Sequence, residues 1–555
     1  MSVDFFESNH EVLKQALAAI ASRGYWSPYP ESPSPRVYGE NAAEEGRQAF
    51  EALRGKDFPL DVNGATGLSG TERSPFGFDL GIRYPQVPVE VLVDQAATAL
   101  ESWREAGPKA WVGVCLEVLK RLNQRSFEVA NAVQHTTGQG FMMAFQAGGP
   151  HAQDRGLEAV TYAWQEMSRI PELADWEKPQ GKHEPLRMRK RFTVVPRGVA
   201  LVIGCSTFPT WNGYPGLFAS LATGNPVIVK PHPGAILPLA ITVKLAREVL
   251  QEAGFDPNIV QLAVHDADDV DTAQQLALHP AVRLIDFTGS SANGNWLEAQ
   301  ARQALVYTEK SGVNQIIIDS AEDIKAVARN LAFSFSLYSG QMCTAPQNVY
   351  IPRDGIQTAE GRLGFDEVAQ ALAQGVERMM ADAAKAVELT GAIQNEATAE
   401  RIDAARSLGL PVLCDSRALE HPHFPEARVR TPLLLLAEAN DERIYQEWFG
   451  PIVFVVATDS TDHSIEVARK AVVENGALTL SGYTTDDAVA ERMRRAAERA
   501  GVSLSLNLTG GVFVNQTAAF SDFHGTGANP AANAALSDGA FVANRFRVVQ
   551  TRWHV

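Results

Sequence analysis

Cys343 is the side chain in this sequence best suited to covalent chemistry. It follows Gly340 and Gln341, beyond an apolar stretch at 331–337 that could run as a helix and before a strand-like stretch at 349–351. A thiol at a glycine-containing break after a helix can project into a cleft, and a thiolate attacks carbonyl carbons well. A buried structural cysteine is the alternative for any lone cysteine, and it stays open at this point.

Glu309 is the candidate general base. It follows the apolar residues 304–307 and precedes a turn, which would place it at the end of a strand. If a thioester formed on Cys343 is to be hydrolysed, a base must take a proton from the attacking water. The alternative is a solvated carboxylate, which is the usual state of a glutamate.

Two further segments could bind a nucleotide. Residues 287–294, with Gly289, Ser290 and Gly294, follow a strand and open a helix, so their backbone N–H groups could bind a pyrophosphate. The segment lacks the GxGxxG spacing, and a plain strand-to-helix turn is the alternative. Lys230 ends another strand and could hold a ribose hydroxyl or a phosphate, or could be a surface lysine. With the thiol and the carboxylate, these turns indicate covalent redox chemistry on an aldehyde.

The elements that must position these residues predict an α/β fold. A helix is expected at 236–253, and a second alternating region runs from 314 to about 506. Apolar strands are expected at 199–204, 226–230, 259–263 and 282–287. Apolar strands alternating with helices indicate a parallel sheet covered on both faces, with ligands at the carboxyl ends of its strands. Residues 89–137 have a helical pattern, and the proline-rich residues 25–35 are expected to form an extended arm.

Composition excludes several classes of function. The 555 residues carry a net charge of -16 without a basic tract, so no nucleic-acid partner is expected. No apolar run approaches the roughly 20 residues that cross a bilayer, and the N-terminus lacks a signal-peptide pattern. The other cysteines, Cys115, Cys205 and Cys414, are interpreted as structural. Because no two cysteines have zinc-ligand spacing, no metal is expected and a reducing cytoplasm fits.

Six blocks of sequence, taken in order, resemble the aldehyde dehydrogenase superfamily from about residue 89 to the C-terminus. The blocks are 208–209, 224–231, 287–290 with Gly294, Glu309, 340–343, and Glu447 with 449–451. The distance of 34 residues from Glu309 to Cys343 also fits the family. Within the superfamily, the long N-terminal arm and residues 207–215 and 340–348 resemble the phenylacetic acid degradation protein PaaN group.

The resemblance implies two parallel α/β domains, one for the cofactor and one for catalysis, with a β-hairpin oligomerisation element. The expected boundaries are 1–185 for the arm and the helical part of the cofactor domain, 186–197 for the hairpin, 198–308 for the cofactor-binding α/β domain, 309–520 for the catalytic domain, and 521–555 for the C-terminal return and oligomerisation strand. A homodimer or homotetramer is implied.

The resemblance also implies roles for single residues. Cys343 would be the nucleophile and Glu309 the base, while Glu447 would bind the nicotinamide ribose. The remaining expected cofactor contacts are Lys230, His232, Pro233, Gly289, Ser290, Gly294 and Phe449. No metal site is implied, and the partner would be a small-molecule aldehyde.

Three departures from the family pattern bear on these roles. The family has an asparagine before the Phe-Pro pair, and its amide helps form the oxyanion hole; Thr207 stands there, and either its hydroxyl or Asn212 could substitute. Pro233 stands where a glutamate clamps the adenosine ribose of NAD, which removes a clash with a 2′-phosphate and favours NADP over NAD. A loop at 523–530 replaces the glycine-rich segment expected near the C-terminus, so the family does not indicate which aldehyde is preferred.

The sequence therefore predicts NAD(P)-dependent oxidation of an aldehyde to its carboxylic acid through a Cys343 thiohemiacetal and thioester. The PaaN resemblance implies a semialdehyde of phenylacetate or aromatic degradation, either free or linked to CoA. One alternative is a CoA-acylating dehydrogenase, against which the base Glu309 argues. The other is a catalytically inactive binding protein with the same fold, which the Thr207 departure keeps open.

Overall fold

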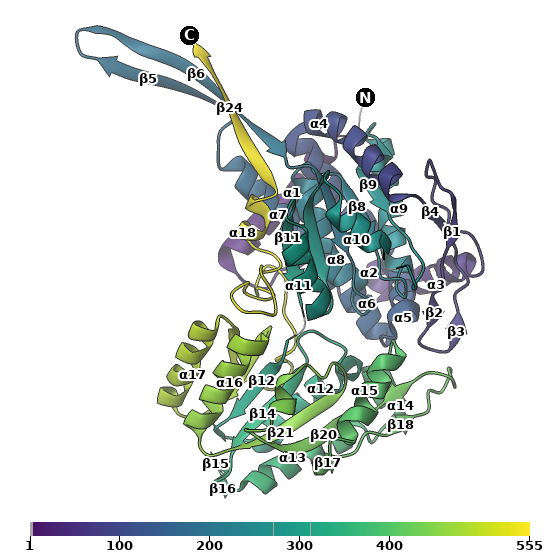
Figure 1. The fold of residues 1–555 in the computed structure, drawn as a ribbon, viewed down its shortest axis with the longest axis vertical. Helices are drawn as coiled ribbons and strands as arrows, with labels where there is room; N and C mark the ends of the chain where they lie inside the picture. The colour runs from purple at the N-terminus through teal and green to yellow at the C-terminus, as the bar shows by residue number, and fades with distance from the viewer. Residues whose placement is uncertain (1–3, 270, 311) are drawn as a thin grey trace.

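The computed structural model describes residues 4–269, 271–310 and 312–555, which form two α/β lobes and a projecting three-stranded sheet (Figure 1). The first lobe contains a parallel five-stranded sheet in the order β11-β10-β7-β8-β9. Its strands are β7 (Val199–Ile203), β8 (Val227–Lys230), β9 (Val260–Leu262), β10 (Val282–Thr288) and β11 (Leu305–Glu309). The apolar residues of β7, β8, β9 and β10 are almost all buried on both faces, as continuous Val, Ile and Leu runs predict, and those of the edge strand β11 are half-buried.

Helices cover this sheet, and the connections between them set the site. They are α4 (Val89–Gln124), α5 (Ser126–Thr137), α6 (Phe141–Gly148), α7 (Pro150–Ser168), α8 (Pro209–Ala222), α9 (Leu237–Glu252), α10 (Asp271–Leu278) and α11 (Ser291–Gln300). The long helix α4 is kinked at Gly107, whose backbone is non-helical and which precedes Pro108. The helical pattern expected at 89–137 is confirmed.

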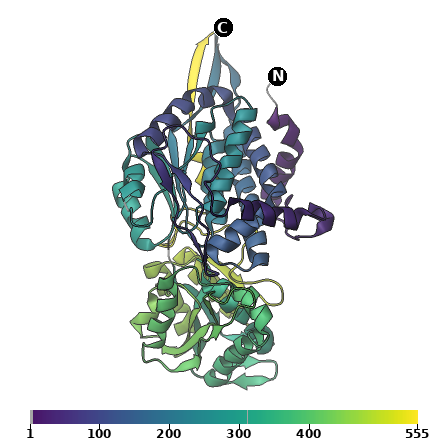
Figure 2. The same cartoon turned by 90° about the vertical axis from the view of Figure 1, so that its right-hand side faces the viewer.

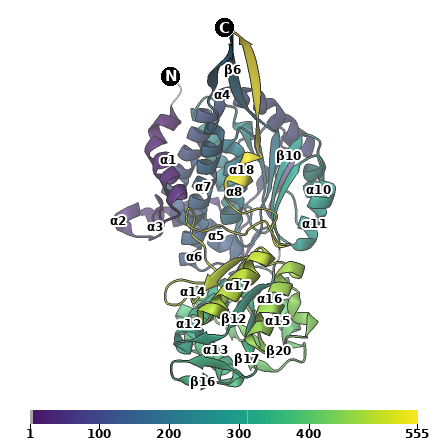
Figure 3. The ribbon, with the colours of Figure 1, turned by 90° about the vertical axis from the view of Figure 1, so that its left-hand side faces the viewer.

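The N-terminal segment packs along the outside of this lobe (Figure 3). Helix α1 (Phe5–Ser22) starts at Asp4, whose carboxylate accepts hydrogen bonds from the first turn, and it packs on α4 and α7. The extended arm that follows is held by Arg23, which donates to the Tyr162 hydroxyl, and by Ser27, which donates to Asp154. Two short helices, α2 (Pro35–Tyr38) and α3 (Ala42–Leu53), and the short strands β1 (Gly67–Ser69), β2 (Arg73–Ser74), β3 (Phe78–Asp79) and β4 (Tyr84–Gln86) lead into α4.

The second lobe contains a seven-stranded sheet in the order β17-β20-β21-β14-β12-β22-β23, parallel except for the edge strand β17. The strands are β12 (Asn314–Ile318), β14 (Pro346–Pro352), β17 (Val412–Cys414), β20 (Leu433–Glu438), β21 (Ile452–Thr458), β22 (Thr479–Tyr483) and β23 (Ser503–Leu506). Its helices are α12 (Ile324–Ser336), α13 (Phe365–Met379), α14 (Ala383–Thr390), α15 (Glu396–Arg406), α16 (Thr461–Asn475) and α17 (Asp487–Ala500).

The third sheet joins β5 (Leu173–Gln180), β6 (His183–Pro196) and β24 (Phe546–His554), and it projects from the first lobe, away from the second (Figure 2). Strand β24 pairs with β6 as the expected partner strand at the chain end. The short helix α18 (Gly539–Ala543) precedes it. Arg545, fully buried, anchors this return through hydrogen bonds of 2.6 and 2.7 Å to the Asp286 carboxylate on β10.

The predicted fold class, two parallel α/β domains with a β-hairpin element, is confirmed. The hairpin is longer than the predicted segment, since β5 begins at Leu173. Among the described residues, no helix combines the length and the apolar character that crossing a membrane requires.

Candidate active site

Cys343 lies in a tightly fixed loop between α12 and β14. Tyr338, Ser339 and Gly340 have φ values of 51°, 48° and 61°, so the chain turns sharply after the helix. A Cβ at Gly340 would lie 2.3 Å from the Gly450 carbonyl oxygen, so only glycine allows this loop to approach the next one so closely. The turn leaves the thiol half-buried and in the lining of a cavity, as the glycine-containing break predicts.

Glu309 ends β11 and is almost completely buried, with 3% of its surface exposed. The Asn212 amide on α8 donates to Glu309 Oε1 over 3.2 Å. Burial by itself raises a carboxyl pKa, but the nearby His524 and hydrogen bonds from Cys343 and Asn212 outweigh it, so the pKa of Glu309 lies below its usual value. The expected position at a strand end is confirmed, and the carboxylate is not a solvated surface group.

His524 completes the group, and the sequence reasoning missed it. Its Nε2 lies 3.7 Å from Cys343 Sγ and 3.1 Å from Glu309 Oε2. The reactive atoms of the three side chains all lie within 4.8 Å of one another. The imidazole is 3% exposed and packs edge-on against the Trp211 ring, with ring centroids 4.5 Å apart. The only signal in the sequence was that His524 belongs to the loop that departs from the family pattern.

The thiol itself is held in an environment that disfavours its ionisation. Desolvation raises the pKa of Cys343 well above its usual range, and the Glu309 carboxylate raises it further. The Cys343 carbonyl accepts a hydrogen bond of 2.9 Å from Asn314, which also holds the following Ala345 carbonyl. Ionisation of Cys343 therefore requires a cation or a proton acceptor close to the sulfur.

The two candidate oxyanion donors are differently placed. Asn212 faces the site, but its amide is bonded to Glu309 and its carbonyl oxygen lies 3.8 Å from Cys205 Sγ. Thr207 lies beside Cys205, and its carbonyl accepts from Gln139. The interpretation of Cys205 as purely structural overlooked this position: its half-buried thiol adjoins the site, and burial raises its pKa to about 11 despite hydrogen bonds from Phe208 and Thr207.

Six of the eight expected cofactor contacts lie at the carboxyl edge of the first sheet. Lys230 ends β8 and is buried, and desolvation lowers its pKa to about 8, opposed by the Asp269 carboxylate. Nearby His265 has a buried Nε2 without a hydrogen-bond partner, an atom that a bound polar group could satisfy. Of the next two expected contacts, His232 is exposed and Pro233 is half-buried. The donors at this edge fit a nucleotide.

The turn from β10 to α11 has the predicted strand-to-helix form. Ser290 caps α11, since its hydroxyl accepts from the Asn293 N–H, and it is exposed. The Gly289 N–H donates to the Glu309 carbonyl. Gly294 packs against Lys310, and a Cβ there would lie 2.5 Å from that side chain. The helix N-terminus therefore opens beside the base, with the geometry that suits an anion.

The last two expected contacts lie on the loop that packs against the Cys343 turn. Glu447 is half-buried and is close enough for its charge to raise the pKa of Cys343. The Phe449 carbonyl accepts a hydrogen bond of 2.6 Å from Arg401. The structure thus brings Glu447 to the thiol and fixes Phe449 through its backbone.

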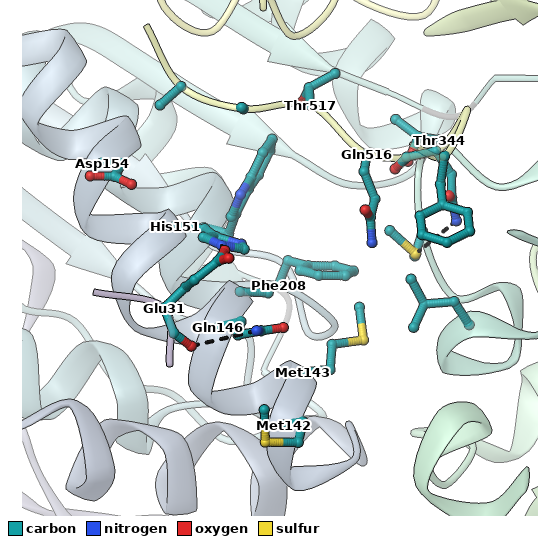
Figure 4. A pocket seen from close by; sticks show the side chains of 18 of the residues that line it. Glu31, Met142, Met143, Gln146, His151, Asp154, Phe208, Thr344, Gln516 and Thr517 are labelled. Carbon is teal, nitrogen blue, oxygen red and sulfur yellow. Dashed lines mark hydrogen bonds and ion pairs between the residues drawn. The ribbon is translucent and has the colours of Figure 1, made fainter. Parts of the chain in front are cut away.

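A cavity of about 910 Å³ has Cys343 and His524 in its lining. Its apolar lining includes Met142, Met143, Phe208, Trp211, Phe333 and Phe513. The N-terminal arm contributes Tyr25, Trp26 and Glu31 to the wall, and Glu31 pairs with His151 over 2.8 Å. Figure 4 shows Glu31 and His151 together on one side of the space, with Gln516 and Thr344 across from them.

The half-buried Cys343 thiol and the buried His524 imidazole line the cavity, and the Glu309 carboxylate lies within 4.8 Å of both. This arrangement, beside the carboxyl edge of the first sheet, agrees with the comparison to known sequences. The pattern of the family described as "Aldehyde dehydrogenase family" matches residues 84–525. The chain belongs to the aldehyde dehydrogenase family.

Relatives within the family differ widely in similarity. The crystal structure of an NAD-dependent aldehyde dehydrogenase from Burkholderia multivorans is 64% identical, covers 100% of both chains and superposes with a TM-score of 0.98. A 1-pyrroline-5-carboxylate dehydrogenase 2 of Bacillus subtilis (strain 168) is 22% identical over 515 residues, which are 88% of this chain and 92% of that one. Aldehyde dehydrogenase relatives from two Gibberella species and Saccharomyces cerevisiae are 27 to 29% identical, but the chain spans only 66%, 63% and 44% of their lengths.

Proposed function

We propose that this protein oxidises an aldehyde to its carboxylic acid with NAD or NADP as the hydride acceptor. The observation that carries the proposal is that Cys343 lines the cavity, with the Glu309 carboxylate within 4.8 Å of its sulfur. The half-buried thiol can reach an aldehyde carbon, and the buried carboxylate lies where a water attacking a thioester would need a base. The family membership and the 64% identical NAD-dependent relative support the same reaction.

The residues divide the reaction into two halves. In the first, the Cys343 thiolate attacks the aldehyde carbon, and the Cys343 backbone N–H with a side-chain donor holds the resulting oxyanion. Loss of hydride from this thiohemiacetal leaves a thioester on Cys343. In the second half, Glu309 takes a proton from water, which attacks the thioester and releases the acid. Lys230, Ser290 and Glu447 would hold the cofactor, which supplies the hydride acceptor when bound.

The CoA-acylating alternative transfers the acyl group to CoA instead of water. The buried Glu309 favours water, because a thiolate acceptor needs no such base. Charge at the cavity also disfavours CoA, a polyanion, since the wall carries the carboxylates of Glu31, Glu388 and Asp522. The two cations in the lining are already paired, Lys385 with Asp382 and Arg155 with Glu158. Measuring free acid against acyl-CoA as product separates the two reactions.

The lining of the cavity indicates the size and polarity of the aldehyde. We infer a bulky, largely apolar aldehyde, because the cavity lining includes three methionines and six Phe, Trp or Tyr side chains. A semialdehyde of phenylacetate or other aromatic degradation, as the PaaN resemblance implies, fits such a cavity. The acidic wall favours the free semialdehyde over its CoA-linked form.

The size of the aldehyde is therefore expected to govern the rate. Across a panel from acetaldehyde to phenylacetaldehyde and six-carbon semialdehydes, kcat/KM measured by NAD(P)H formation should rise by about 10- to 100-fold, since each buried methylene contributes roughly 0.8 kcal/mol. Phe333→Ala, which enlarges the cavity and breaks the Phe333–Phe513 stack, should reduce this size preference. A panel in which acetaldehyde is the best substrate contradicts the inferred class.

Two observations bear on the choice of cofactor. Pro233 stands where the family clamps the ribose with a carboxylate, which favours NADP. The Asp269 carboxylate, however, lies near enough to Lys230 and His265 to affect their pKa values, so it could serve as that clamp and repel a 2′-phosphate. The Burkholderia multivorans relative is NAD-dependent.

We predict that NADP is accepted at least as well as NAD, and that Asp269 limits this preference. Asp269→Asn should raise kcat/KM for NADP relative to NAD by about tenfold, because a carboxylate–phosphate repulsion is removed. Pro233→Glu should do the reverse and cut NADP use more than NAD use. Steady-state kinetics with both cofactors measures the ratios. A clear NAD preference in the unmodified protein that Asp269→Asn leaves unchanged would contradict both assignments.

We also propose a homodimer or homotetramer joined through the projecting sheet. Strand β24 forms its outer edge and exposes Val549 and Trp553, which a second subunit could cover. The four separate free cysteines fit a reducing, cytoplasmic location.

A further inference from the structure

His524 lies beside the sulfur of Cys343, where an imidazole can exchange a proton with the thiol. We propose that His524 takes the thiol proton of Cys343 and then, as an imidazolium, donates a hydrogen bond to the thiohemiacetal oxyanion. This inference rests on the proposed function, in which Cys343 attacks the aldehyde. It assigns His524 both the activation of the nucleophile and the side-chain donor role that Thr207 and Asn212 leave open.

Geometry supports the first role. His524 Nε2 lies 3.7 Å from Cys343 Sγ, within hydrogen-bond reach for sulfur. The same nitrogen lies 3.1 Å from Glu309 Oε2, an oxygen with no hydrogen-bond donor of its own. A proton on Nε2 therefore converts an unsatisfied contact with a carboxylate into an ion pair, in a site where 3% or less of either side chain is exposed. Glu309 thus favours proton transfer from the thiol to the imidazole.

Charge balance gives a second reason. A Cys343 thiolate beside the Glu309 carboxylate would place two negative charges in a buried site, and burial with that carboxylate already raises the pKa of the thiol. Protonated His524 reduces the net charge of the three groups from minus two to minus one. The groups facing it are Cys343, Glu309 and the Trp211 ring. Arg155 lies over the Trp211 ring, 5.4 Å from its centroid, and pairs with Glu158.

The other donors are engaged elsewhere. The Asn212 amide donates to Glu309 Oε1, and Thr207 adjoins Cys205. Further out, the Lys310 ammonium group pairs with Glu298. His524 is the group whose hydrogen-bonding nitrogen faces the sulfur on which the oxyanion forms.

The steps balance in atoms and electrons. The S–H bond breaks and an N–H bond forms at Nε2, and the sulfur pair then forms the S–C bond while the carbonyl π pair moves to oxygen. The aldehyde is oxidised when its hydride leaves for NAD or NADP and the C=O bond re-forms. After water attacks and Glu309 takes its proton, the C–S bond breaks, and the departing sulfur recovers the proton from Nε2.

Alkylation of Cys343 by iodoacetamide, without aldehyde or cofactor, tests the first role directly. His524→Gln keeps a polar side chain but cannot accept a proton, so the alkylation rate at pH 7 should fall at least tenfold and its rise with pH should shift upward. In the same variant, kcat/KM for the best aldehyde should fall by about 10²- to 10³-fold, because removing one oxyanion donor typically slows a reaction by that factor. The matched control, His10→Gln, changes an exposed histidine on α1 and should leave both measurements unchanged.

Several results would overturn the proposal. One is an unchanged alkylation profile in His524→Gln; another is a profile that Glu309→Gln shifts and His524→Gln does not. If His524→Gln fails to fold, His524→Asn, which also cannot accept a proton, is measured in its place. An alkylation profile that His524→Asn leaves unchanged excludes the role. Failure of the proposed function would instead appear as aldehyde oxidation surviving Cys343→Ala.

Discussion

Cys343→Ala abolishes aldehyde-dependent NAD(P)H formation, by at least about 10⁴-fold, and leaves cofactor binding intact. The reason is that a covalent route through a thioester has no substitute for the sulfur, since an alanine side chain has neither a nucleophile nor an ionisable group. The surrounding loop is held by backbone contacts and by the Gln341 amide, which donates to the Tyr338 and Ala392 carbonyls. The substitution removes none of these contacts. Steady-state kinetics with the best aldehyde measures the loss, and cofactor fluorescence titration measures binding.

The control for this variant is Cys414→Ala. Cys414 is also a half-buried free thiol, but it lies on the edge strand β17 of the second lobe. It should keep full activity and full alkylation of Cys343. Undiminished turnover in Cys343→Ala would exclude the assignment, and the adjoining thiol Cys205 would then be the next nucleophile to test.

Local patterns in the sequence were sufficient to predict the framework of the site. The strands at 199–204 and before Lys230 were predicted correctly, because strands buried on both faces need continuous apolar residues. The glycine-containing break before Cys343 was also predicted correctly, since Gly340 is required by its close approach to Gly450. These features depend on neighbours in the chain or on burial alone.

Contacts between distant segments were beyond this kind of reasoning. His524 reaches Cys343 across 181 residues, and Asn212 reaches Glu309 across 97. Nothing near His524 in the chain indicates burial beside a thiol; only the topology, in which the chain returns past the site before β24, brings it there. Helix α1 was missed for a similar reason, because α4 and α7 stabilise it through tertiary packing.

Glu309→Gln should slow acid release far more than thioester formation. Glutamine keeps the shape and the Asn212 contact but cannot take a proton from water, so hydrolysis should fall by about 10²- to 10⁴-fold. Rapid mixing of enzyme, cofactor and aldehyde should then give a burst of NAD(P)H close to one per active site, followed by a slow phase. Mass spectrometry of the quenched protein should detect the acyl group on Cys343.

The contacts of Glu309 make the alternative outcome equally informative. Its carboxylate lies 3.1 Å from His524 Nε2, so the same substitution also removes the anion that stabilises a protonated imidazole. If the burst is lost and no thioester accumulates, Glu309 acts before hydride loss, by assisting ionisation of Cys343 through His524. Measuring the burst over a range of pH separates the two roles: a base needed only for hydrolysis leaves the burst rate unchanged, whereas a group that supports the imidazolium makes the burst recover as pH rises and the thiol ionises unaided.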